Sequence, residues 1–115
     1  MPKRFVFLRE YKVGKEIVWV YSCGLVFNQK RITHLTITDH FQIGHSDAIT
    51  KRLICGLVRR LHKKRMEPEP KDMTSDRDVF VRERMTYGDR KYRLIFWFKD
   101  HTTNHLWIRN CHPQD

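Results

Sequence analysis

The chain has 115 residues, which is enough for one domain with one hydrophobic core and little else. Its 23 Lys and Arg against 13 Asp and Glu give a formal net charge of +10, which points to nucleic acid, an anionic membrane surface or an acidic protein as the partner. Apolar residues make up 40%, so the chain can form a core and is not expected to be disordered. No apolar run approaches the ~18 residues of a membrane span and the N-terminus does not resemble a signal peptide, so we expect a cytoplasmic protein that does not enter a membrane.

The cysteines and histidines do not predict a bound metal. Cys23, Cys55 and Cys111 are odd in number and lie far apart, which favours neither a disulfide framework nor a zinc site. We expect all three to be small buried apolar residues. His40 and His45 lie five residues apart, which is not the spacing of a zinc-binding helix, and no third ligand of matching type is nearby. We therefore expect no metal and no other cofactor.

The first third of the chain alternates apolar and polar residues in a way that is typical of strands. Residues 3–10 and 16–22 flank a polar turn at 11–15 and predict a β-hairpin. A second pair of short strands is expected at 24–28 and 31–38. The chain should therefore begin with an N-terminal β-segment.

From Ser46 onward the apolar residues recur at helical spacing. The periodic residues run from Ile49 to Leu61, and Ser46 or Asp47 is available as the N-cap. We expect an amphipathic helix from residue 47 to about 65, with a basic side that adds to the positive field of the molecule. A linker that contains two prolines follows the helix.

The last forty residues predict a three-stranded antiparallel meander. Segments 78–87, 91–99 and 105–112 are rich in β-branched and aromatic residues and are bounded by turn formers. The predicted fold is therefore α+β: an N-terminal β-hairpin segment and one main amphipathic helix packed on the C-terminal three-stranded antiparallel meander, in one domain over residues 1–115.

A two-residue Gly-Asp turn at 88–89 fixes the predicted register of this meander. It places Arg84 opposite Arg93 and Arg82 opposite Ile95. Side chains alternate between the two faces of a strand, and one face is expected to pack on the helix. That apolar face contains Val79, Val81, Met85, Tyr92, Leu94, Phe96, Phe98, Leu106 and Ile108. The other face contains Arg82, Arg84, Lys91, Arg93, Trp97, Trp107 and Arg109.

Two further residues stand out in this register. Glu83 is the single misfit, because it would face the core. His112 falls opposite Tyr92, at the open end of the sheet.

Four arginines on one sheet face repel one another unless an anion lies over them, and a phosphodiester backbone is the anion that we expect. Trp97 and Trp107, opposite each other, would provide a surface on which an unstacked base can lie. The residues expected to bind RNA are Arg82, Arg84, Lys91, Trp97, Trp107 and His45. The open alternative is an ordinary solvated sheet face, on which Arg and Trp are well tolerated.

The histidines provide candidate chemistry for this surface. A ribonuclease that works without metal needs a base for the 2′-hydroxyl proton, an acid for the leaving 5′-oxygen and cations that stabilise the phosphate. We expect His40 and His112 to be the base and acid in either order, because histidine titrates near neutral pH. Tyr92 would assist, and Arg93 and Arg109 would stabilise the transition state. A structural role for either histidine is the open alternative.

Two stretches of the sequence resemble a known superfamily. KYRLIFWFKDHTTNHLWIRNCHPQD resembles the C-terminal half of RelE/ParE-superfamily toxins, and TITDHFQIGHSDAITKRLICGLVRRL resembles the helix entry of the related MqsR-like group. The resemblance implies a type II toxin that cleaves mRNA or other RNA without metal and that a small acidic antitoxin neutralises, and it leaves open whether the RNA is free or is ribosome-bound mRNA. By position, Arg82, Arg84, Arg93 and Arg109 would match the superfamily's phosphate-binding residues, and His112 its C-terminal Tyr or His.

This chain also departs from the superfamily pattern. Those toxins usually begin with one strand and a helical hairpin, whereas here we expect an extra β-segment and one helix. Two alternatives to a nuclease remain open. The first is a non-catalytic basic module that binds nucleic acid or protein, such as a phage or plasmid inhibitor. The second is a gyrase inhibitor of the ParE kind.

Overall fold

The computed structural model describes residues 3–42, 49–70 and 77–114, which form a mixed α+β fold with a six-stranded sheet and one short α-helix. The elements are β1 (Lys3–Val13), β2 (Glu16–Phe27), β3 (Lys30–Thr38), the 3₁₀ turn η1 (Asp39–Gln42), α1 (Lys51–Arg59), β4 (Val79–Tyr87), β5 (Arg90–Phe98) and β6 (His105–Gln114). The strand order is β1-β2-β3-β6-β5-β4. Within the described ranges, no helix has the length and apolar character to cross a membrane.

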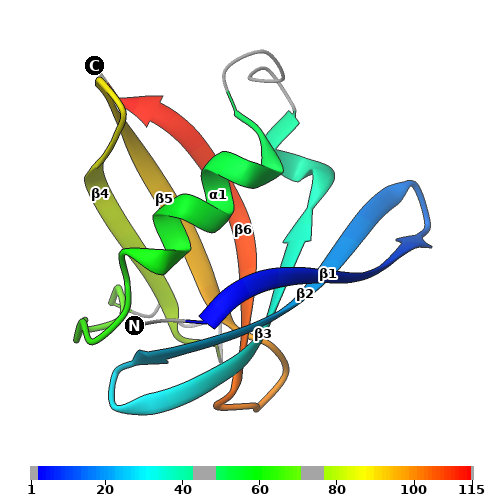
Figure 1. The fold of residues 1–115 in the computed structure, drawn as a ribbon, viewed down its shortest axis with the longest axis horizontal. Helices are drawn as coiled ribbons and strands as arrows, with labels where there is room; N and C mark the ends of the chain where they lie inside the picture. The colour runs from blue at the N-terminus through cyan, green and yellow to red at the C-terminus, as the bar shows by residue number, and fades with distance from the viewer. Residues whose placement is uncertain (1–2, 43–48, 71–76, 115) are drawn as a thin grey trace.

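The sheet consists of two antiparallel meanders that one parallel pair of strands joins. Strands β1, β2 and β3 form the first meander, and β4, β5 and β6 form the second. Residues 34–37 of β3 pair in parallel with residues 105–108 of β6. Figure 1 shows α1 lying across β4, β5 and β6. The predicted C-terminal meander is therefore present, but it is half of a larger sheet rather than a sheet by itself.

The two N-terminal hairpins have tight turns that their local backbone explains. Gly14 turns β1 into β2 with φ +62°, a conformation in which glycine has no steric cost. Asn28 and Gln29 join β2 to β3 with φ +51° and +63°, as in the two-residue turns that favour hairpins. The two strands predicted on either side of position 23 are one continuous strand, β2, with a register shift between Ser22 and Leu25.

The α-helix is shorter than predicted. It begins after Thr50, whose Oγ1 accepts a hydrogen bond from the Leu53 N–H at 3.1 Å and so caps the first turn. The expected caps, Ser46 and Asp47, lie outside the described residues. Thr50 supplies the side-chain oxygen that a helix start needs. The sequence pattern predicted a start at residue 47, four residues before the observed one, so Thr50 was not predicted as the N-cap.

The segment after α1 is hydrogen-bonded to the end of β2. The Lys63 N–H donates to the Val26 carbonyl at 2.7 Å, and the Asn28 N–H donates to the Lys64 carbonyl at 3.0 Å. His62 Nδ1 accepts the Val26 N–H at 3.1 Å. These bonds satisfy backbone groups at the end of β2 and in the segment after α1, and they tie that segment to the sheet.

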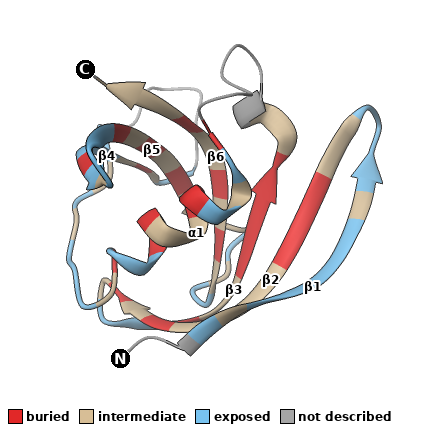
Figure 2. Ribbon diagram, turned by 45° about the horizontal axis from the view of Figure 1, so that its top comes forward, coloured by how far each residue is buried: buried red, intermediate tan, exposed pale blue. Residues whose placement is uncertain are grey.

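The hydrophobic core lies between α1 and one face of the sheet, which we call the inner face; the opposite face is the outer face. Phe27 is fully buried at its centre, with ring centroids 5.4 Å from those of Phe80 and Phe96. Figure 2 shows the buried segments along β2, β3, β5 and β6. Cys23 and Cys111 are buried, as predicted for the cysteines, whereas the third, at position 55, is half-buried.

A β-bulge divides β4 into two parts. The predicted two-residue turn at 88–89 is confirmed by the pairing of the strands on either side of it. The register then shifts by one residue between Met85 and Arg82, so Glu83 and Arg84 form a bulge in which Arg84 has φ +55°.

Beyond this bulge, the β4 side chains lie on the face opposite to the predicted one. Phe80 pairs with Phe96 and is buried, whereas Val79 and Val81, expected in the core, are only half-buried. The bulge also explains the misfit of Glu83, which is exposed and does not face the core. The prediction for these side chains was wrong because it assumed that β4 has no bulge.

Strands β5 and β6 contain a second register shift, at Arg109. It moves the end of β6 by one residue relative to β5. His112 therefore lies opposite Arg93, and Pro113 lies opposite Tyr92. The predicted pairing of His112 with Tyr92 is wrong by one position.

The packing of α1 on the end of β4 gives a stability test. A Cβ atom at Gly56 would overlap the Tyr87 ring. We expect Gly56→Ala to lower the free energy of unfolding by about 1–3 kcal/mol through overpacking, although alanine is the better helix former by about 1 kcal/mol. Urea denaturation measures the change. In a Tyr87→Val background the same substitution should be neutral or stabilising, and an equal loss in both backgrounds would show that the ring is not the cause.

Candidate nucleic-acid interface

The strand register aligns outer-face residues in rows across the sheet. One row contains Arg9, Val20, Thr36, Trp107 and Trp97, each paired with the next. The predicted pairing of Trp97 with Trp107 is confirmed. Their sequence neighbours on both strands are core residues, so the two indoles lie on the outer face.

A shallow pocket of about 300 Å³ lies at the tryptophan pair. Its lining residues are Glu16, Arg77, Trp97, Lys99, Asp100, Trp107 and Arg109. The Arg77 Cζ atom lies 4.4 Å from the centroid of the Trp97 ring, a cation–π contact, and Arg77 Nη2 is 3.9 Å from Asp100 Oδ1. The lining includes three cations, Arg77, Lys99 and Arg109, and two carboxylates, so the tryptophan pocket has a net positive charge.

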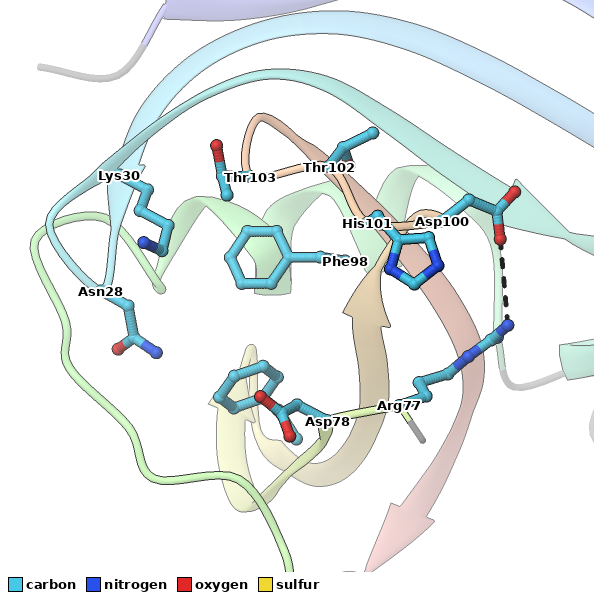
Figure 3. Close-up of a pocket in the computed structure, with 10 residues that line it drawn as sticks. Asn28, Lys30, Arg77, Asp78, Phe98, Asp100, His101, Thr102 and Thr103 are labelled. Atoms are coloured by element: carbon cyan, nitrogen blue, oxygen red, sulfur yellow. Dashed lines mark ion pairs between the residues drawn. The ribbon is translucent and has the colours of Figure 1, made fainter. Parts of the chain in front are cut away.

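A larger hollow of about 480 Å³ lies where the β2–β3 turn, the start of β4 and the β5–β6 loop meet. Figure 3 shows the Phe98 ring in this hollow and the ion pair between Arg77 and Asp100 at its side. Those two residues also line the tryptophan pocket, so their ion pair stands between the two hollows. Lys30 and Arg77 balance Asp78 and Asp100 here, so the larger hollow has no charge excess that would favour a polyanion.

Arg93 and His112 come together on the outer face. They are directly opposite each other in the register, a position at which Cβ atoms are about 4.5–5.5 Å apart. Arg93 Nε lies 3.6 Å from Glu83 Oε1, which is an ion pair but too long for a hydrogen bond. That Nε is buried and has no hydrogen-bond partner among the described residues. Arg93 is therefore a partly exposed cation in register with His112, and its buried Nε faces the Glu83 carboxylate.

The other two strand arginines are not assembled as predicted. Arg82 lies opposite Leu94, a core residue, so its position is on the inner face at an exposed edge. Arg84 is exposed in the bulge and does not pair with Arg93. The predicted pairings of Arg84 with Arg93 and of Arg82 with Ile95 are both wrong. The cationic outer face keeps two of the four predicted arginines, Arg93 from β5 and Arg109 from the bulge in β6.

The remaining predicted site residues are dispersed. Tyr92 is only 6% exposed and belongs to the core, so it lies on the face opposite to Arg93. His40 is half-buried in η1, which contacts β6, and its N–H donates to Thr38 Oγ1 at 3.4 Å. Lys91 is exposed at the start of β5. His45 lies outside the described residues.

The structure also contains a histidine pair that sequence reasoning missed. His34 and His105 pair across β3 and β6, with ring centroids 5.6 Å apart. Thr33 Oγ1 lies 2.9 Å from His34 Nδ1, and Thr36 Oγ1 lies 2.6 Å from His105 Nε2. The two histidines are 71 positions apart in the chain, and no local pattern indicated that their strands are neighbours.

Burial and nearby cations lower the pKa of His105 to about 4. Burial is the largest cause, followed by the charges of Lys99, His34 and Arg9, while Asp100 acts in the opposite direction. His105 is therefore a neutral imidazole near pH 7, held within a positive field.

The cysteines do not provide a second reactive centre. Burial raises the pKa of Cys23 and of Cys111 to about 12, and that of Cys55 to about 11, so these thiols stay protonated near neutral pH. Within residues 3–42, 49–70 and 77–114, no group of three or more His, Cys, Asp or Glu is placed to hold a metal ion.

Comparison of the chain with known protein families, with curated proteins and with solved structures finds no match. The RelE/ParE resemblance thus rests on the two sequence stretches alone. The outer face has to be interpreted from its own geometry and charge.

The neutral state of His105 predicts a pH dependence of stability. Its folded pKa of about 4 lies below its ordinary value, so the unfolded chain binds more protons between the two values. This contribution is fully present above about pH 6.5 and is lost as the pH falls through about 4. His105→Gln should flatten the decline in unfolding free energy over that window, as measured by urea denaturation at several pH values. His101→Gln, at an exposed loop position, is the matched control. An unchanged slope in His105→Gln would contradict the assignment.

Proposed function

We propose that the chain is a metal-independent endoribonuclease that binds single-stranded RNA on its outer face. The observation that carries the proposal is the placement of Arg93 opposite His112 on the same face as the paired Trp97 and Trp107. A phosphate-binding cation, a proton-transfer group and a base-stacking surface thus lie on two adjacent strands. RNA cleavage is the chemistry that uses all three.

The tryptophan pocket supports binding of an unpaired base. An indole on which a base stacks contributes about 1–3 kcal/mol without selecting a sequence. Lys99 and Arg109 line the same pocket and would attract the adjoining phosphates. Arg77 now covers one side of Trp97, so an incoming base would stack on Trp107 or displace the guanidinium.

The chemical step is in-line attack of the ribose 2′-oxygen on the adjacent phosphorus. A base removes the 2′-hydroxyl proton, the O2′–P bond forms, the P–O5′ bond breaks and an acid protonates the leaving 5′-oxygen. The products are a 2′,3′-cyclic phosphate and a 5′-hydroxyl. His112 is the first proton-transfer group, and His40, from the η1 turn that contacts β6, is the proposed second one.

Arg93 and Arg109 would stabilise the charge that develops on the phosphate. The Arg93 side chain is 36% exposed beside His112, so its guanidinium would contact a phosphate oxygen there, while the buried Nε faces the Glu83 carboxylate. Tyr92 has no part in this mechanism, because its ring lies in the core. Arg82 and Arg84 remain available only for more distant backbone contacts.

The superfamily resemblance adds a biological setting to the proposal. The element order β3, α1 and then β4 to β6 is a strand, a helix and a meander, to which β1 and β2 add a hairpin. We propose that the protein acts as a cytoplasmic toxin and that an acidic antitoxin covers its cationic outer face. The net charge of +10 supports an acidic partner as well as RNA.

The catalytic assignment predicts a separation of cleavage from binding. His112→Ala should slow cleavage of a labelled single-stranded RNA at least 100-fold, the usual loss on removal of a general acid or base. The affinity for a 2′-O-methyl oligonucleotide, measured by fluorescence anisotropy, should change little. Trp107→Ala should weaken that affinity by about 1–3 kcal/mol. His101→Ala, which removes a histidine away from Arg93 and His112, is the control and should leave both cleavage and affinity unchanged.

Two outcomes would reject the catalytic assignment. The first is that His112→Ala and Arg93→Ala both cleave RNA at the rate of the parent protein. The second is tight RNA binding with no cleavage by the parent protein, which would favour a non-catalytic binding module.

A further inference from the structure

Three basic side chains lie at the start of β6 on the outer face, and the charge of a fourth, Arg9, acts on them from β1. His34 pairs with His105 across the parallel strands, and the Lys99 N–H donates to the His105 carbonyl at 2.9 Å. Lys99 also lines the tryptophan pocket, which places its side chain on the same face. Arg9 comes from β1, in the row of the sheet that contains the two tryptophans.

Each imidazole of this pair is held through one nitrogen, and the other nitrogen has no hydrogen-bond partner among the described residues. The Thr33 hydroxyl lies at His34 Nδ1 and the Thr36 hydroxyl at His105 Nε2, so His34 Nε2 and His105 Nδ1 remain. Thr36 is fully buried within the sheet and cannot move its hydroxyl far. The His105 ring is therefore fixed in its orientation.

The surroundings favour an anion over a metal ion. Two imidazoles supply half of a tetrahedral metal site, and no third ligand is placed to complete it among the described residues. The charges that act on His105 are those of Lys99 just after β5, His34 on β3 and Arg9 on β1, against Asp100 in the β5–β6 loop. A bound anion would accept hydrogen bonds from the imidazoles and reduce the repulsion between the cations.

We propose that His34, His105 and Lys99 form a phosphate-binding subsite, to which Arg9 adds positive charge. This histidine subsite would hold a phosphodiester of the same RNA strand that the tryptophan pocket binds, and its identification with RNA rests on the proposed function. At about 3.3 Å per residue, the start of β6 lies about 23 Å from His112, which is farther than one nucleotide reaches. The strand would therefore run from the histidine subsite, past Trp107, to Arg93 and His112.

The pKa of His105 reports directly on the histidine subsite. A bound phosphate stabilises the protonated imidazole, so inorganic phosphate should raise the pKa of His105 from about 4. We expect a rise of about one pH unit, which corresponds to tenfold tighter binding by the protonated form. The measurement is an NMR titration of the His105 ring proton with and without phosphate. The same titration is then made with a 2′-O-methyl tetranucleotide, which cannot be cleaved.

Charge-matched variants separate the histidine subsite from a general field effect. Lys99→Gln and Arg9→Gln should each raise the pKa of His105 without phosphate and reduce the phosphate-induced rise. Arg60→Gln removes the same charge at an exposed position next to the end of α1 and should do neither. Equal effects of all three variants would overturn the proposal, and so would a titration that phosphate does not change.

The remaining outcomes distinguish this proposal from the proposed function. His112→Ala should lose cleavage and keep the phosphate-induced rise. If phosphate raises the pKa and the parent protein cleaves no RNA, the histidine subsite stands and the nuclease proposal fails. A rise with phosphate but not with the tetranucleotide would overturn the assignment to RNA.

Discussion

The parallel pairing of β3 with β6 is the constraint on which the rest of the structure depends. Four residues of each strand pair, and they join two antiparallel meanders into one six-stranded sheet. The connection between the meanders passes through α1, which covers one face of that sheet. The same pairing places His34 beside His105 and Thr36 beside Trp107 on the other face. A slip of one residue would move these outer-face side chains into the core.

Two bulges then determine which charges share the outer face. Without them, four arginines would project together and repel one another strongly. The bulge in β4 separates Arg82 and Arg84 from Arg93, and the bulge in β6 moves His112 opposite Arg93. Lower repulsion between the arginines therefore offsets part of the cost of the two interrupted strand ladders, and the second bulge places His112 opposite Arg93. Bulges near binding sites commonly redirect side chains in this way.

Local features of the fold were predictable from the sequence, and non-local ones were not. The turn at 88–89 and the pairing of Trp97 with Trp107 follow from turn chemistry and alternation, which act over a few residues. The bulges leave little trace in an alternating pattern, and the misfit of Glu83 was their one visible sign. The pairing of His34 with His105 joins distant segments, so no periodicity could indicate it. For this reason the sequence predicted the tryptophan pair but not the histidine pair.

The proposed binding of RNA to the outer face can be tested directly in one NMR spectrum, which resolves the indole N–H signals of the three tryptophans. Trp97 and Trp107 lie on the outer face, whereas Trp19 is buried in the core and donates its indole N–H to Glu10 Oε1 at 2.6 Å. On addition of a single-stranded 2′-O-methyl oligonucleotide, the signals of Trp97 and Trp107 should shift while that of Trp19 stays in place. A saturable shift of Trp19 alone, or binding that leaves all three signals unchanged, would contradict the account.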